Sequence, residues 1–68
     1  MTMWLITDKG GGFEVSVIGI IAGVGAVQWE RIPFPTLEGA RSVVPEGSVC
    51  VPRDPEDPPR VVETWKRA

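Results

Sequence analysis

The side chains that could carry out covalent chemistry in this 68-residue chain are a single cysteine, Cys50, and three serines. A nucleophile of either kind needs a neighbouring base, which is most often histidine. The chain contains no histidine and no tyrosine. Cys50 stands between Val49 and Val51, a setting typical of a buried and therefore unreactive thiol. We therefore expect no catalytic residue, and we expect Cys50 to belong to the core.

Carboxylates gather in one proline-rich segment, where Asp54, Glu56 and Asp57 lie among four prolines. Paired carboxylates can transfer protons, and several together can hold a metal ion. Both uses need a tight template, whereas prolines and charges at this density are typical of a solvated loop. The sequence therefore predicts neither a metal site nor a cofactor here.

Two glycine-rich segments resemble phosphate-binding loops in composition only. Residues 22–25 begin like the G-x-G-x-x-G of dinucleotide-binding folds, but the third position holds Gln28. Pro33 then follows too soon for the helix that this motif requires. Lys9 precedes the glycines at 10–12, which is the wrong order for a P-loop. Both segments are better interpreted as turns, because glycine accepts positive φ.

Residues 15–29 form a run of fifteen residues without a charge. Gly19 and Gly23 within it have the G-x-x-x-G spacing of packed membrane helices. A spanning helix needs about 20 apolar residues, and Glu14 and Glu30 close the run at both ends. Insertion of this segment into a membrane is therefore the alternative that we rank second.

Strands are the preferred interpretation of the same run, because apolar and polar residues alternate at its start. Phe13, Val15 and Val17 would share one face of a strand, with polar residues between them on the other. Gly23 and Gly25 supply a turn in the middle of the run. We therefore expect two strands joined near these glycines.

The pattern over the whole chain predicts a single domain, residues 1–68, of the α+β class. We expect a small antiparallel sheet of four to five short strands with one short helix at about residues 36–44. Thr36 can cap that helix and Pro45 ends it. The third strand should end before Pro33, because proline cannot donate to a strand ladder. The expected strands cover residues 1–7, 13–20, 27–30, 49–51 and 61–65.

Three tryptophans, Trp4, Trp29 and Trp65, each fall in an expected strand. Large aromatic side chains supply apolar area to a small core, and tryptophan also anchors many protein interfaces. Trp65 is the best candidate for an anchor, since it lies beside two basic residues near the end of the sequence.

Charge is distributed unevenly, with thirteen of sixteen charged residues in positions 30–68 and a net charge of −2. A nucleic-acid partner usually requires a basic surplus, so none is expected. One thiol and the lack of an export signal in the first residues favour a reducing, cytoplasmic compartment.

These observations favour a non-enzymatic protein-binding module, either an inhibitor or an adaptor that blocks a larger macromolecular machine. We expect a protein partner with a basic patch. The candidate partner-binding residues are Asp54, Glu56, Asp57, Glu63 and Trp65. The alternative interface is the sheet near Trp4 and Trp29.

In size and composition the chain is similar to small phage proteins such as anti-CRISPR proteins, although no motif carries that similarity. The alternatives are a membrane-associated subunit with residues 15–29 inserted, and a small structural subunit of a phage particle or other assembly.

Overall fold

Three consecutive strands form one side of the sheet. The computed structural model describes all 68 residues, beginning with β1 (Thr2–Asp8), β2 (Phe13–Ile21) and β3 (Gly25–Phe34). Each strand is antiparallel to the one before it. Gly23 and Gly25, which join β2 to β3, have φ of 81° and 97°, values that favour glycine. The expected pair of strands with a turn at these glycines is therefore confirmed.

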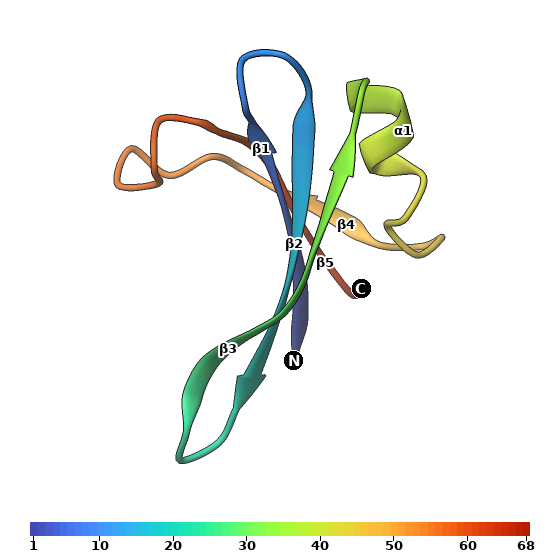
Figure 1. The fold of residues 1–68 in the computed structure, drawn as a ribbon. Coiled ribbons are helices and arrows are strands. Elements are labelled where there is room, and N and C mark those ends of the chain that lie inside the picture. The colour runs from blue at the N-terminus through green and yellow to red at the C-terminus, as the bar shows by residue number, and fades with distance from the viewer.

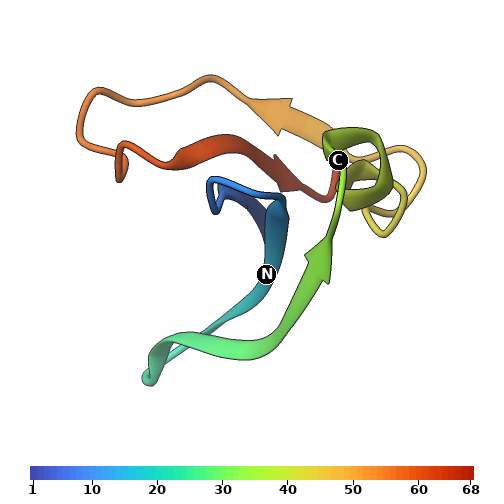
Figure 2. The same cartoon turned by 45° about the horizontal axis from the view of Figure 1, so that its top comes forward.

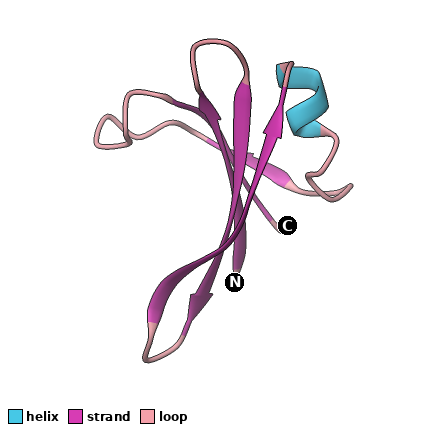
Figure 3. Ribbon diagram, in the orientation of Figure 1, coloured by secondary structure: helices cyan, strands magenta, loops and turns pink.

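The rest of the chain crosses the sheet and adds two strands on the side of β1 that faces away from β2 (Figures 1 and 3). After β3 come the helix α1 (Leu37–Arg41) and the strands β4 (Val49–Val51) and β5 (Val61–Lys66). The strand order is β3-β2-β1-β5-β4, and every neighbouring pair is antiparallel. An antiparallel sheet with one short helix is therefore confirmed, and strand far outweighs helix. The single helix has five residues, and no helix of this protein has the length and apolarity needed to span a bilayer.

Two boundaries differ from the sequence-based expectation. The helix begins as expected after Thr36, whose Oγ1 accepts a hydrogen bond from Gly39 N at 3.0 Å, but it ends at Arg41 instead of about residue 44. The third strand continues through Pro33, which pairs with Glu14. An edge strand tolerates proline because half of its N–H groups point away from the sheet, and β3 is an edge strand.

The core lies between α1 and the three strands on which it packs, β1, β2 and β3. Its fully or nearly buried members are Trp4, Ile6, Val15 and Ala40. The register places Ile6 opposite Val15, and Trp4 between Val17 and Trp65 on its two sides. Partly buried side chains packed against these four come from three strands, the helix and the segment after it: Phe13, Val17, Phe34, Leu37, Val43, Val44 and Trp65.

Cys50 is exposed, so the expectation that it belongs to the core is wrong. It lies in β4, a three-residue strand at the edge of the sheet that is paired only with β5. Flanking valines indicate burial only where something covers them, and Val49 itself is 45% exposed. Trp29 also departs from the core interpretation, with 56% of its surface exposed, whereas Trp4 is buried.

Candidate functional site

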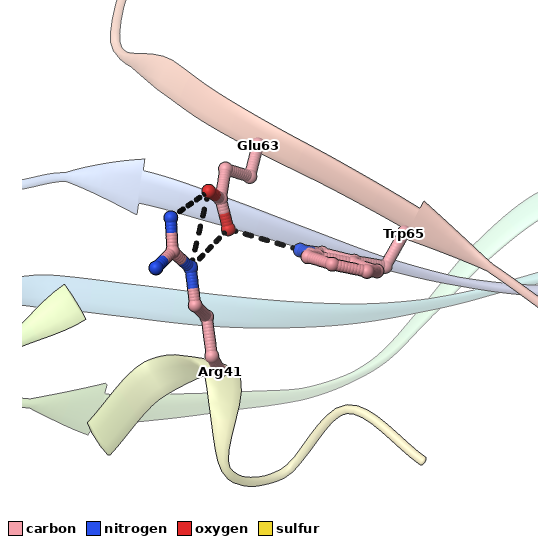
Figure 4. Close-up of polar contacts among 3 residues, drawn as sticks. All are labelled: Arg41, Glu63 and Trp65. Atoms are coloured by element: carbon pink, nitrogen blue, oxygen red, sulfur yellow. Dashed lines mark hydrogen bonds and ion pairs between the residues drawn. The ribbon is translucent and has the colours of Figure 1, made fainter. Parts of the chain in front are cut away.

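Glu63 and Trp65 share one face of β5, as their spacing predicts, and they interact with each other. Trp65 Nε1 donates a hydrogen bond to Glu63 Oε1 at 3.0 Å. Arg41, in the last turn of α1, donates from Nε to Glu63 Oε1 at 2.9 Å and to Oε2 at 3.1 Å, and from Nη2 to Oε2 as well (Figure 4). Through the Arg41 side chain, this cluster links the end of α1 to β5, although the helix itself packs on β1, β2 and β3.

Electrostatics in this cluster favour the charged form of both partners. The hydrogen bonds from Arg41 lower the pKa of Glu63, and the indole N–H of Trp65 lowers it further, against the opposing effect of desolvation. The hydrogen bond with Glu63 raises the pKa of Arg41. The Glu63 side chain is only 15% exposed. The Arg41 side chain is 49% exposed, so the carboxylate of this pair is largely covered while its guanidinium group remains open to solvent.

The sequence gives little signal for Arg41, which was not among the expected site residues. Arg41 and Glu63 are 22 positions apart and lie in a helix and a strand. Only the crossing of the chain over the sheet brings them together. A basic residue in the last helical turn is a favourable partner for the helix dipole, but that rule names no carboxylate.

The segment that connects β4 to β5, residues 52–60, is called the acidic loop below. Two of its carboxylates fix its shape. Asp54 Oδ1 accepts a hydrogen bond from Glu56 N at 2.9 Å, and Asp57 Oδ2 accepts one from Asp54 N at 2.9 Å. The backbone N–H of Asp57 also donates to Asp54 O at 2.9 Å. Glu56 makes no side-chain hydrogen bond and is exposed.

Two arginines hold the acidic loop against the body of the domain. Arg53 donates from Nη1 to Val61 O at 2.7 Å and from Nη2 to Pro58 O at 3.5 Å. Arg60 donates from Nη1 to Asp8 O at 3.4 Å. Both guanidinium groups therefore bind backbone carbonyls of the domain, and neither forms an ion pair with the loop carboxylates.

A hollow of about 240 Å³ lies between the acidic loop and β5. Asp57 and Glu63, which were predicted to act together, both line it, whereas Trp65 does not. Arg53 and Cys50 contribute to the same wall. Of the charged side chains here, Arg53 is bound to carbonyls, Glu63 to Arg41, and Asp57 to the amide of its own loop. The hollow thus presents no charged group that is free of an internal partner.

A second surface lies at the far end of the β2–β3 hairpin, residues 20–29, which is called the arm below. Figures 1 and 2 show it extending away from the rest of the sheet. Seven large hydrophobic residues of the protein are notably exposed, and four of them lie in the arm. These four are Ile20, Ile21, Val24 and Trp29, and Val24 is 69% exposed.

Trp29 owes its position to an irregularity in β3. Val17 pairs with Glu30 and Ile18 pairs with Gln28, so Trp29 is the extra residue of a β-bulge. Its indole lies over Gly19, where an added Cβ would fall 2.5 Å from Trp29 Cζ2. Gly19, which has the spacing of a membrane-helix motif, therefore leaves the space that the indole of Trp29 occupies.

No protein-family model, no curated protein and no solved structure matches this chain.

Proposed function

We propose that this protein is a non-enzymatic protein-binding domain whose acidic loop docks on a basic patch of a larger partner. The observation that carries the proposal is the preorganisation of that loop. The carboxylates of Asp54 and Asp57 each accept a backbone hydrogen bond at 2.9 Å within the loop, and prolines restrict the backbone between them. A loop that is already ordered loses little conformational entropy when it binds.

The distribution of charge in the loop supports the same proposal. Asp54 and Glu56 are exposed, and so are Arg53 and Arg60, whose guanidinium groups donate to backbone carbonyls. Three carboxylates outnumber two guanidinium groups in the loop, and we expect this excess of negative charge to steer a positively charged partner during encounter. In this proposal Glu63 and Trp65 have a supporting role, because they hold α1 to β5 next to the hollow that Asp57 also lines.

The finer proposal is that the domain inhibits or adapts a larger macromolecular machine in the cytoplasm. A basic groove that normally holds nucleic acid is the kind of partner surface that a rigid row of carboxylates fits. Small phage inhibitors such as anti-CRISPR proteins are the nearest functional analogy, and its support is size and composition alone.

Affinity capture from the native cell, followed by mass spectrometry, would identify the partner and test the proposal. The informative variant is Glu56→Lys, because this side chain has no internal hydrogen bond to lose. Glu46→Lys is the matched control, since it makes the same charge change at an exposed position outside the loop. We expect Glu56→Lys to slow association and to weaken its salt dependence, and Glu46→Lys to change neither. Equal behaviour of both variants would show that the loop is only a solvated edge.

A further inference from the structure

The two edges of the sheet are protected to different degrees. β4 forms one edge and has only three residues, whereas β3 forms the other and has ten. An edge strand exposes unpaired backbone N–H and C=O groups, and natural proteins guard such edges with charges, prolines or bulges. The base of β3 carries Glu30, Arg31 and Pro33. The first part of β3, residues 25–28, lies in the arm and carries no charge and no proline.

Apolar side chains of the arm lie on both faces of the sheet. The register puts Ile21 on the same face as Val17 and Gly19, and the indole of Trp29 covers Gly19 there. Ile20 points to the opposite face, by alternation along β2. Exposed apolar area on two faces of one hairpin marks an interaction site, and the open edge runs between these faces.

A protein strand suits this surface better than a lipid surface does. Lipid would cover the apolar side chains, but it offers no partners for the unpaired backbone groups of the β3 edge. A strand supplies both apolar side chains and backbone hydrogen bonds, which is the basis of strand addition at sheet edges. The occupant must also be uncharged along its length, because residues 25–28 of the arm have no charge to match.

The arm itself meets this description, and its sequence is compatible with a two-fold axis. Antiparallel pairing of β3 with β3 of a second copy, centred on Val27, sets residues 25–29 against the same residues in reverse order. Val27 then faces Val27, and Trp29 faces Gly25. The indole of Trp29 already packs over a glycine within its own chain. Glu30 and Arg31 fall outside the paired segment in both copies, so no like charges are opposed.

We propose that two copies of this chain associate through their arms, by antiparallel pairing of β3 residues 25–29 about a two-fold axis at Val27. The closed symmetry of such a pair limits assembly to a dimer. The arm has about ten residues, fewer than the roughly 20–30 a side of a standard stable interface, so the dimer should dissociate on dilution. The arm lies at the end of β1 opposite the acidic loop, because Met1 bonds to Ile20 while Asp8 bonds to Arg60. Dimer formation should therefore not depend on partner binding, and each proposal can fail without the other.

Sedimentation velocity over a range of chain concentrations tests this proposal, with substitutions at the axis. We expect the wild-type chain to shift from monomer to dimer as its concentration rises. Val27→Lys and Val27→Glu should each be monomeric, because each places like charges directly opposite one another. An equimolar mixture of the two should dimerise again, because the axis then joins opposite charges. Val62→Lys, the same change at an exposed position of β5, should dimerise like the wild type.

Three outcomes would overturn the proposal. One is a wild-type chain that stays monomeric at every concentration, whether or not it sediments with phosphatidylcholine vesicles; vesicle binding would assign the arm to lipid instead. Another is a dimer that persists in Val27→Lys and Val27→Glu alone. The third is a mixture of the two variants that stays monomeric although each remains folded by circular dichroism.

Discussion

Glu63 is the residue on which the attachment of α1 to β5 depends, and its titration gives the first prediction. Because Arg41 lowers the pKa of Glu63, folding favours the ionised carboxylate. The resulting stabilisation is complete above the ordinary pKa of 4.5 and is lost as the pH falls through the lowered value of the folded state. We expect Glu63→Gln to reduce the free energy of unfolding at neutral pH by about 1 kcal/mol or less, since the pair is partly solvated.

Urea unfolding of both proteins from neutral to acidic pH measures this effect. The difference between wild type and Glu63→Gln should shrink as the pH falls below 4.5. Glu46→Gln, at an exposed position without an ion pair, is the control and should show no such dependence. A constant difference at every pH would contradict the ion-pair explanation.

Gly19 gives a second prediction at this scale, because a Cβ at this position would overlap the indole of Trp29. The indole is half exposed and can swing away, so Gly19→Ala should cost about 1 kcal/mol, the low end of overpacking effects. In a Trp29→Ala background the same change should cost nothing, since the obstacle is gone. A double-mutant cycle of unfolding free energies measures this coupling, and additive effects would show that the two residues do not interact.

At the scale of elements, local patterns predict most of the strands. Period-two alternation and glycine turns place β1, β2, β4 and β5 to within one or two residues. β3 was missed at Pro33 because tolerance of proline depends on which strand becomes an edge, and that is settled by pairing between distant segments. The exposure of Cys50 has the same origin, since flanking valines do not reveal that β4 lies outside the area covered by α1.

In the candidate site, too, local spacing predicts some features, whereas others depend on contacts between distant segments. Glu63 and Trp65 were correctly placed on one face, because their spacing alone determines it. The hydrogen bonds of Glu63 with Arg41 and the packing of Trp65 against the core could not be predicted, because both require the chain to cross the sheet. The charge-free run was visible at once, but its exposure depends on the length of β2 and β3 beyond the end of β1.

The acidic loop carries the prediction that belongs to this scale. Asp57→Ala removes the acceptor of the Asp54 N–H group and should loosen the loop, whereas Asp57→Asn keeps an acceptor oxygen. We expect faster amide hydrogen exchange at Asp54 in Asp57→Ala, and near wild-type exchange in Asp57→Asn. The loss of stability should stay below about 1.5 kcal/mol, because the bond is exposed to solvent. Equal exchange rates in the two variants would show that the carboxylate does not order the loop.

At the scale of the whole molecule, stability depends on very few side chains. Five hydrophobic residues are buried, and Ile6 is completely so. Ile6→Ala should cost about 2–5 kcal/mol, a large part of the roughly 5–15 kcal/mol that stabilises a typical domain. Ile20→Ala is the matched control, because Ile20 is 42% exposed, and it should cost far less. Thermal unfolding by circular dichroism in dilute solution measures both, and similar losses would contradict the assignment of the core.

Because the core is small, association through the arm should contribute measurably to the stability of the native state. If only folded chains pair, dimerisation stabilises the native state by mass action, and the stabilisation grows with chain concentration. The thermal midpoint of the wild-type chain should therefore rise with concentration, while that of Val27→Lys should not. Scanning calorimetry at several concentrations checks this. Parallel behaviour of the two proteins would show that the exposed arm does not contribute to the stability of the fold, which would then rest on the core and the side chains packed against it.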